Sequence, residues 1–375
     1  MQLRKLEVNE HGLTRGLWEK VFPEDSKEFL DYYYFIKTRD NQIYVIEEDG
    51  QIRSMLQLNP YLLEVEDGQF ESHYIIAVAT EEGYRKRGYM GELLRKSMLD
   101  MYDRKEPFTF LMPAAEAIYT PYDFRFVYAQ EQYESLGQDG EADRDWTDAA
   151  MRDAGEMAEF FNSHFAGKYQ VHAVRDEKYY QTMIFEQQSE NGGVKLLKKD
   201  GRVVGMFAYA CEEHTAEIRE PLYLPGYEEE FEQAVHMLKR DVGAAVKIYA
   251  GHGGASTKNV PVIMVRILHL ETLLSAMKVK EGEELCCSFA VLDSIITKNS
   301  RVWKLTGGTD SRDIQVRETE DSEGVLTISA LTSLLFGYRT VEEVRKEKDV
   351  IIPERLGEEL GKIQTLSKVF LNEIV

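Results

Sequence analysis

Between residues 74 and 99 the pattern of apolar and polar residues changes from that of a strand to that of a helix. Residues 74–80 form an apolar run, which is typical of a strand covered on both faces. Apolar residues then recur at helical spacing: Leu93, Leu94, Met98 and Leu99. The change of period falls between these two patterns, where Gly83 and Gly88 allow a tight turn. The stretch therefore predicts a strand, a glycine-containing loop and a helix.

Strand-like runs joined by Asp-Gly pairs precede this stretch and reappear later. Asp49-Gly50 and Asp67-Gly68 lie between such runs and predict hairpins. Residues 195–207 repeat the pattern of residues 43–55, with Asp200-Gly201 at the turn. A repeat of this kind predicts a second domain related to the first, but its strand and helix are not separated by a comparable basic, glycine-containing loop.

The last third of the chain has a different order of elements. It predicts a strand at 262–267, a helix at 270–277, strands at 285–292 and 325–328, and helices at 329–337, 341–346 and 353–371. A polar segment at 138–146 is suited to a linker. Together the patterns predict an α/β chain with mixed α+β sheets in three domains, 1–140, 141–260 and 261–375.

Composition narrows the class of protein. The 375 residues are 43% hydrophobic and 30% charged, as in ordinary soluble proteins. No stretch approaches the roughly 18 apolar residues of a membrane span, and the N-terminal residues do not resemble a signal peptide. We therefore expect a cytoplasmic protein without a membrane partner. The net charge of -21 argues against nucleic acid as a partner. It suits a cationic substrate, although solubility alone explains it equally well.

Metal and disulfide chemistry have little support in the sequence. Cys286 and Cys287 are adjacent in a strand-like run, so their side chains should point to opposite faces, and Cys211 is far away in sequence. The eight histidines form no H-E-x-x-H pattern, and we expect no metal. The glycine-rich residues 251–258 lack phosphate-loop spacing and precede Pro261, which predicts a turn.

The loop before the predicted helix suits an anion. Its backbone amides from about residue 87 to 91 have no partners at the start of a helix. Arg85, Lys86 and Arg87 add positive charge in an acidic chain. Neither G-x-x-x-x-G-K-[ST] nor G-x-G-x-x-G is present. A phosphate-bearing ligand fits this loop, and so does an ordinary strand and helix joined by a solvated basic turn.

The full pattern V-x-T-x-x-x-Y-R-x-x-G-x-x-x-x-L-L, from Val78 to Leu94, resembles motif A of the GCN5-related N-acetyltransferases (GNAT). Met90 stands where glycine or alanine is commonest in that family. The resemblance implies acetyl-CoA as cosubstrate, with the main chain of Val78 and Thr80 pairing with the pantetheine arm. The residues it assigns to the cofactor site are Val78, Ala79, Thr80, Arg85, Lys86, Arg87, Gly88, Tyr89, Met90 and Gly91.

A second motif narrows the resemblance within the family. Ile118-Tyr119 followed by Tyr122-Asp123-Phe124 is similar to the I-Y-x-x-F-G-Y of the enhanced intracellular survival (Eis) branch. That branch implies tandem GNAT-like domains followed by a sterol carrier protein-like domain. It also implies Tyr119 as general acid, and the C-terminal carboxylate of Val375 as a base or amine-orienting group. The alternatives are a tyrosine packed against the sheet and a last helical turn packed on its own domain.

The resemblance also implies an acceptor and an assembly. It places Phe22, Asp25, Tyr33 and Tyr34 in the acceptor pocket, where aromatic and acidic groups suit an aminoglycoside-like or polyamine-like cation or a lysine side chain. These residues suit a helix core and cap equally well. Eis-type rings imply a homo-oligomer, specifically a hexamer. A non-catalytic acyl-CoA or lipid-binding module is the alternative function, favoured by the sterol carrier-like domain and Met90.

Overall fold

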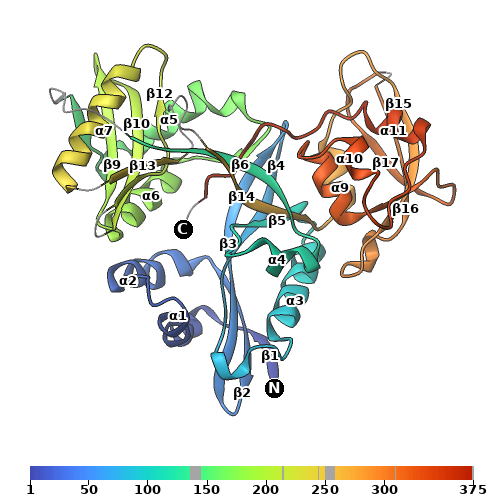
Figure 1. The fold of residues 1–375 in the computed structure, drawn as a ribbon, viewed down its shortest axis with the longest axis horizontal. Coiled ribbons are helices and arrows are strands. Elements are labelled where there is room, and N and C mark those ends of the chain that lie inside the picture. Colours follow the sequence, from blue (N-terminus) through green and yellow to red (C-terminus); the bar gives the residue numbers. More distant parts are fainter. Residues whose placement is uncertain (136–144, 213–214, 244, 250–257, 309, 374–375) are drawn as a thin grey trace.

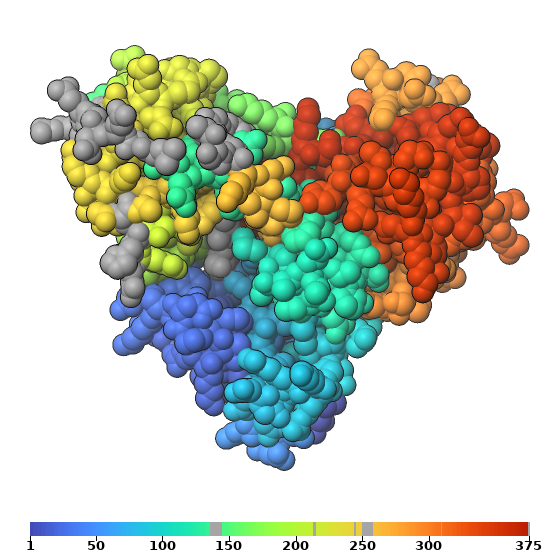
Figure 2. Space-filling model, in the orientation of Figure 1, coloured from blue at the N-terminus to red at the C-terminus, as the bar shows by residue number. Residues whose placement is uncertain are grey.

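The computed structural model describes residues 1–135, 145–212, 215–243, 245–249, 258–308 and 310–373. These residues form three lobes, shown in Figure 2 in blue and cyan, in green and yellow, and in orange and red. The expected linker at 138–146 and the expected turn at 251–258 fall mainly outside the described residues, and Val375 falls wholly outside them. In the described part of the chain, no helix is both long and apolar enough to cross a membrane.

The first lobe is built from antiparallel strands followed by one parallel strand (Figure 1). Its elements are β1 Gln2–Lys5, η1 Val8–Thr14, α1 Arg15–Val21, α2 Lys27–Phe35, η2 Lys37–Arg39, β2 Gln42–Glu48, β3 Gln51–Val65, β4 Gly68–Thr80, η3 Glu82–Tyr84, α3 Tyr89–Asp103, β5 Phe108–Leu111, α4 Glu116–Tyr119, η4 Thr120–Tyr122 and β6 Arg125–Glu134. Both predicted hairpins are present. Asp49 and Gly50 form the first turn, at φ 54 and 71. Val65 pairs with Gly68 in the second hairpin, so its turn residues are Glu66 and Asp67.

The second lobe repeats the hairpin of the first. Its elements are β7 Trp146–Asp148, η5 Met151–Asp153, α5 Ala154–His164, η6 Ala166–Lys168, β8 Val171–Ala173, α6 Glu177–Ser189, β9 Gly193–Lys199, β10 Arg202–Glu212, β11 Thr215–Ile218, β12 Leu222–Tyr223, α7 Glu228–Val242 and β13 Ala245–Tyr249. The turn between β9 and β10 has Asp200 at φ 51 and Gly201 at φ 76, nearly the geometry of the first hairpin turn. The repeat predicted from the Asp-Gly pairs is therefore confirmed.

The remaining elements form the third lobe, except for two strands, β14 and β19, that pair with strands of the other two lobes. They are β14 Lys258–Ile267, α8 Leu270–Ala276, β15 Leu285–Leu292, η7 Thr297–Asn299, β16 Val302–Gly307, β17 Gln315–Thr319, β18 Val325–Thr327, α9 Ile328–Leu335, α10 Val341–Val344, α11 Glu354–Leu360 and β19 Val369–Phe370. Strands β17, β16, β15 and β18 form their own sheet. Strand β14 instead pairs with both β5 and β6, so the chain adds a strand to the first lobe before it enters the third.

One mixed sheet runs through the first two lobes. Among the described residues its order is β1-β2-β3-β4-β5-β14-β6-β13-β11-β10-β9-β7, with β8, β12 and β19 paired at its sides. The antiparallel pairing of β6 with β13 carries the sheet from one lobe to the next. The α/β class with mixed sheets is confirmed.

The end of the chain differs from its prediction. Residues 353–371 were expected to be helical, but α11 ends at Leu360 and Gly361 follows as its C-cap. Residues 361–373, here called the C-terminal strap, leave the third lobe and cross to the other two (Figure 1, dark red). Strand β19 within the strap pairs in parallel with β8, which pairs with β3. Long-range pairing therefore overrides the local apolar pattern that indicated a helix.

Candidate functional site

Strands β4 and β5 separate soon after they meet. They are parallel, and their pairing is confined to Tyr74 and Phe110. Strand β5 ends one residue later, at Leu111, and the chain turns away through Pro113. The C-terminal half of β4 consequently has a strand neighbour only on its β3 side among the described residues. An extended ligand has a free main-chain edge to pair with.

The direction of the main-chain groups along that edge follows from the pairing with β3. Ala77 takes φ 51 and forms a bulge, where the register between β3 and β4 shifts. Beyond the bulge, the amide of Glu81 donates to the carbonyl of Arg53 at 2.9 Å, so this residue faces β3. Alternate residues of an antiparallel strand face opposite edges. The main-chain groups of Val78 and Thr80 therefore point to the free edge.

Helix α3 begins at a left-handed glycine. Gly88 has φ 88 and ψ 0, and no side chain caps the helix. The first intrahelical bond runs from the amide of Glu92 to the carbonyl of Gly88 at 3.1 Å. The amides of Tyr89, Met90 and Gly91 thus have no partner in the part of the chain that the structure describes. Unpartnered amides at a helix N-terminus form an anion-binding site.

The basic residues beside this helix start are exposed. Arg85 donates through Nε to the carbonyl of Thr80 at 3.1 Å, which holds its guanidinium near the free edge of β4. Arg87 donates to the carbonyl of Gly83 at 3.0 Å and lies 4.5 Å from the ring centroid of Tyr84. The structure thus brings the predicted cofactor residues of β4 and of the loop to one place, with amides and cations suited to a diphosphate. We call this group of residues, from Val78 to Gly91, the cofactor cradle.

Tyr119 ends the short helix α4 and is buried, with 8% of its surface exposed. Its ring lies 5.9 Å from that of Phe124, and it shares a hydrophobic cluster with Leu111 and Met264. Burial raises the pKa of the Tyr119 hydroxyl to about 12. The phenol is therefore protonated at neutral pH, as a proton donor must be.

The four residues predicted to wall the acceptor pocket gather around Trp18. The ring centroid of Trp18 lies 6.0 Å from that of Phe22, 4.7 Å from that of Tyr33 and 5.9 Å from that of Tyr34. Asp25 accepts a hydrogen bond from Trp18 Nε1 at 2.6 Å; burial raises the pKa of this carboxyl, and the Trp18 bond opposes the shift. Tyr33 is fully buried and donates to Asn59 at 2.7 Å. This group forms an aromatic core between α1 and α2.

A cavity of about 240 Å³ lies where the first lobe, the second lobe and the strap meet. We call it the interlobe cavity. It is lined from six places in the chain by residues that include Lys37, Tyr61, Glu186, Glu220 and Glu373. The residues around Trp18 are not among its lining residues. Five of the lining residues are carboxylates and three are cations, so the lining has an excess of negative charge.

Two buried glutamates shape the electrostatics of the interlobe cavity. Glu186 accepts a hydrogen bond from Tyr32 at 3.1 Å and lies 3.7 Å from Lys37 Nζ. Glu373, on the strap, accepts one from Tyr179 at 2.8 Å through Oε2. Burial raises the pKa of both carboxyl groups, while Lys37 opposes the shift at Glu186 and Arg175 opposes it at Glu373.

One oxygen of Glu373 stands out from the rest of the lining. Among the described residues Oε1 is buried without a hydrogen-bond partner, and its ion pair with Arg175 Nη2, at 3.8 Å, is beyond hydrogen-bond distance. A buried carboxylate oxygen without a donor is costly. A ligand that donates a hydrogen bond here, such as an ammonium group, would remove that cost.

Aromatic rings continue from the cavity wall into the sheet of the first lobe. Tyr61, which lines the cavity, has its ring centroid 5.9 Å from that of Phe110, and the centroid of Tyr74 is 5.3 Å from that of Phe110. Burial raises the pKa of the Tyr74 hydroxyl, and a main-chain hydrogen bond with Met112 opposes the rise.

The sequence analysis did not find the cavity glutamates. Glu186 lies within an ordinary amphipathic helix, so its pattern gives no signal. Glu373 does give one, because Asn372-Glu373 interrupts an apolar chain end. A polar pair inside such an end indicates a buried polar contact. Among the described residues, no three His, Cys, Asp or Glu side chains are grouped so that they could hold a metal ion.

Comparisons with known proteins agree with this geometry. Residues 2–127 match the acetyltransferase (GNAT) domain family, and residues 270–374 match the sterol carrier protein domain family. Among curated proteins, none matches this chain in sequence. The chain therefore contains a GNAT acetyltransferase domain in residues 2–127 and a sterol carrier protein domain in residues 270–374.

Solved structures extend the likeness to the whole chain. A probable N-acyltransferase from Enterococcus faecalis is 17% identical with a TM-score of 0.83, over 100% of this chain and 99% of that one. A GCN5-related N-acetyltransferase from Anabaena variabilis is 14% identical with a TM-score of 0.80, over 100% of both chains. An Eis protein from Mycobacterium abscessus is 13% identical with a TM-score of 0.71, again over 100% of both. The chain has the fold of the Eis-type acetyltransferases.

Proposed function

We propose that the protein transfers the acetyl group of acetyl-CoA to a primary amine of a small cationic acceptor that enters the interlobe cavity. The observation that carries the proposal is the buried Oε1 of Glu373, which among the described residues accepts no hydrogen bond and has only a 3.8 Å ion pair with Arg175, on a cavity wall with excess negative charge. An ammonium group satisfies both features, because it supplies hydrogen-bond donors and positive charge together. An aminoglycoside-like or polyamine-like amine, or a lysine side chain, has such a group.

The size of the cavity favours a slender acceptor within this class. Its volume of about 240 Å³ is below the roughly 300–1,000 Å³ of common ligand pockets. A linear polyamine or a lysine side chain suits such a space better than a multi-ring aminoglycoside.

The cofactor end of the reaction is assigned to the free edge of β4 and the start of α3. Acetyl-CoA is the donor that GNAT enzymes use. The main-chain groups of Val78 and Thr80 would pair with its pantetheine arm, and the amides of Tyr89, Met90 and Gly91 would hold the diphosphate. Arg85, Lys86 and Arg87 would add the opposite charge. Support comes from the edge, which has no strand neighbour among the described residues, and from the amides, which have no partner there.

Tyr119 is proposed as the general acid that protonates the departing thiolate. Its pKa of about 12 keeps the proton in place until a strong base forms beside it. The likeness to Eis assigns the C-terminal carboxylate of Val375 as the base or the amine-orienting group. Support for that assignment comes from Glu373, two positions earlier in sequence, which lines the cavity.

A thiol-release assay with acetyl-CoA and a panel of amines tests the function. Spermidine, kanamycin and Nα-acetyl-lysine cover the three acceptor types. We expect amine-dependent release, and we expect Glu373→Gln to raise KM for the amine about tenfold, as loss of a charge-assisted hydrogen bond should. Glu177→Gln on the exposed face of α6 is the control. Release that no amine stimulates, or equal behaviour of the two variants, contradicts the proposal.

Two variants test the assigned catalytic groups. Tyr119→Phe should lower kcat and spare the affinity for acetyl-CoA, because it removes the hydroxyl that carries the proton and keeps the ring that packs on Phe124. Equal losses of kcat and affinity would indicate a structural tyrosine. Extra residues after Val375 should lower turnover far more than stability, and an extended chain that folds with unchanged kcat would rule out the terminal carboxylate.

We also propose that the chain assembles into a homo-oligomer, specifically a hexamer, as the Eis resemblance implies. Multi-angle light scattering should give a mass near a sixfold multiple of the single chain. A single-chain mass at working concentrations would contradict it.

A further inference from the structure

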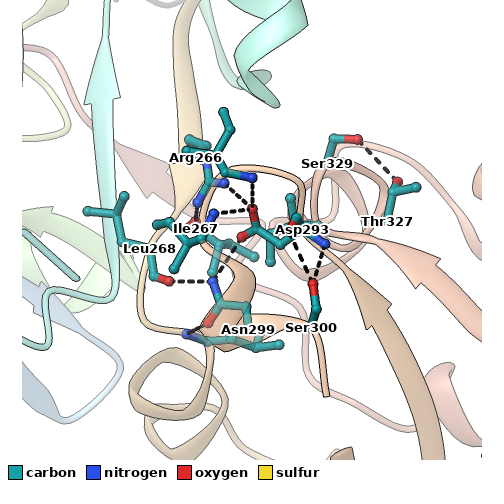
Figure 3. A network of polar contacts seen from close by, with 12 residues as sticks. Arg266, Ile267, Leu268, Asp293, Asn299, Ser300, Thr327 and Ser329 are labelled. Atoms are coloured by element: carbon teal, nitrogen blue, oxygen red, sulfur yellow. Dashed lines mark hydrogen bonds and ion pairs between the residues drawn. The ribbon is translucent and has the colours of Figure 1, made fainter. Parts of the chain in front are cut away.

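A fully buried ion pair joins strand β14 to the third lobe. Arg266 Nη2 donates to Asp293 Oδ1 at 2.6 Å, and both side chains have 0% exposure (Figure 3). Arg266 also donates to the carbonyl of Ile267. A buried pair of this kind gives little net stability, but loss of one partner strands a charge in the interior. We therefore look for the role of this pair in the loop and strand that it holds together, and not in its contribution to stability.

The carboxylate of Asp293 organises the loop that follows it. Its Oδ1 also accepts the amides of Ile295 at 3.0 Å and Ile296 at 2.8 Å, and its Oδ2 accepts Asn299 Nδ2 at 3.0 Å. Asn299 in turn donates to the carbonyl of Leu268 at 2.6 Å, at the end of β14 (Figure 3). We call residues 293–300 the buttress loop, because one carboxylate holds it against the first lobe.

The buttress loop contributes a side chain to the core around Tyr119. Ile296 is fully buried and belongs to the same hydrophobic cluster as Tyr119, Phe124 and Leu111. The third lobe is thus part of the packing that surrounds the general-acid candidate.

The turn that follows Tyr119 meets the same network. It ends at Asp123, which has φ 67. Burial raises the pKa of the Asp123 carboxyl, Asp293 adds to the rise, and Arg266 and a hydrogen bond from Ser329 oppose it. Strand β14 also pairs with β5 and β6 on both sides of the turn, for example Met264 with Leu111.

We propose that Arg266, Asp293 and Ile296 are positioning residues, through which the sterol carrier protein domain holds Tyr119 in place for proton transfer. The proposal rests on the proposed role of Tyr119. None of the three residues is expected to touch substrate. They act by fixing the segment that carries Tyr119 from β14 and from the buttress loop.

The test is a double-mutant cycle in the full chain. Asp293→Asn should lower kcat by about 10- to 100-fold, as small misplacements of reacting groups do, while KM for acetyl-CoA stays within about twofold because the cradle is untouched. In the Tyr119→Phe background, Asp293→Asn should cause no further fall in kcat. A general loss of structure would instead lower kcat by the same factor in both backgrounds, which would overturn the proposal.

The matched control breaks a different contact of the same loop. Lys298 pairs with Asp103 at 2.8 Å across the same two lobes, with both side chains exposed. Asp103→Asn should leave kcat unchanged. If it lowers kcat as much as Asp293→Asn, the lobe contact in general is responsible and the proposal is overturned.

A second variant covers the case in which Asp293→Asn does not fold. Ile296→Ala shortens one side chain in the Tyr119 cluster and leaves every charge in place. It should reproduce the fall in kcat and the loss of effect in the Tyr119→Phe background, and an unchanged kcat would overturn the proposal. Tyr119→Phe alone reports on the proposed function separately: unchanged kcat in that variant refutes the role of Tyr119, whichever way Asp293→Asn behaves.

Discussion

Phe370 packs the C-terminal strap into the hydrophobic core of the second lobe, and its removal should release the strap from that lobe. The side chain is 5% exposed. It stacks on Tyr169 with centroids 4.5 Å apart and an interplanar angle of 12°, and on Phe161 at 6.3 Å and 20°. The guanidinium of the fully buried Arg175 lies 4.9 Å from its ring centroid. Phe370→Ala removes these contacts together.

The expected magnitude follows from that burial. A buried Phe→Ala change costs about 3–5 kcal/mol. The main-chain pairing here is short: β19 pairs with β8 over two residues, and the carbonyl of Lys368 accepts the amides of Gln170 at 2.8 Å and Val171 at 3.3 Å. Most of the loss should therefore fall on local opening of the strap rather than on global unfolding. At 1.4 kcal/mol per factor of ten, the open fraction should rise by roughly two to three and a half powers of ten.

Hydrogen exchange resolved by mass spectrometry reads this opening directly. In Phe370→Ala, the amides of Gln170 and Val171 should exchange faster, while those of β4 should not. KM for the amine should rise, because Glu373 leaves the interlobe cavity with the strap. Phe185→Ala is the control, since Phe185 on α6 is 42% exposed. Unchanged exchange at residues 170–171 in Phe370→Ala would refute the reasoning.

Two further predictions concern the cofactor cradle and the cavity glutamates. Gly88→Ala should weaken acetyl-CoA binding about tenfold in a calorimetric titration, because a side chain at φ 88 costs about 1–2 kcal/mol. Gly83→Ala is the control and should bind acetyl-CoA normally, because the space around Gly83 is open. Equal affinities of the two variants would contradict the assignment of the cofactor cradle. Burial raises the pKa of Glu186 and Glu373, so the native chain binds more protons than the unfolded chain above the ordinary value of about 4.3. Their contribution to the free energy of unfolding therefore falls as the pH rises from that value through the raised native pKa. The double variant Glu186→Gln, Glu373→Gln should flatten this pH dependence of the free energy of unfolding, measured in denaturant titrations. An unchanged pH dependence would contradict the raised pKa of the two glutamates.

Sequence reasoning succeeded where the signal is local. The cradle depends on a strand, on Gly88 and on the first turn of α3, all within a few residues of one another, and their geometry is what that pattern requires. The interlobe cavity depends on contacts between distant segments, since Tyr61, Glu186 and Glu373 meet only when the lobes and the strap are assembled. No periodicity within one element reports on such contacts. The strap was missed for the same reason, because its extended form is imposed by β8.

The parallel strands of the second lobe differ from those of the first at the edge that we propose for the cofactor. Strands β11 and β13 are parallel and joined through helix α7, as β4 and β5 are joined through α3. They pair along four successive residues, from Thr215 with Ala245 to Ile218 with Ile248, whereas β4 and β5 pair at one position. The edge that would receive a pantetheine arm is therefore closed in the second lobe.

The start of α7 is equally unsuited to a diphosphate. Its first turn carries Glu228, Glu229 and Glu230, and the Glu228 carboxylate accepts the amide of Gly226 at 2.9 Å. The positive end of this helix is thus already matched by carboxylates of the chain itself, which would repel a phosphate. In the first lobe the corresponding amides have no such partner among the described residues and stand beside arginines. The separated strands and the uncapped helix, more than the repeated hairpin, thus distinguish the lobe for which we propose acetyl-CoA binding from the lobe that supplies a wall of the interlobe cavity.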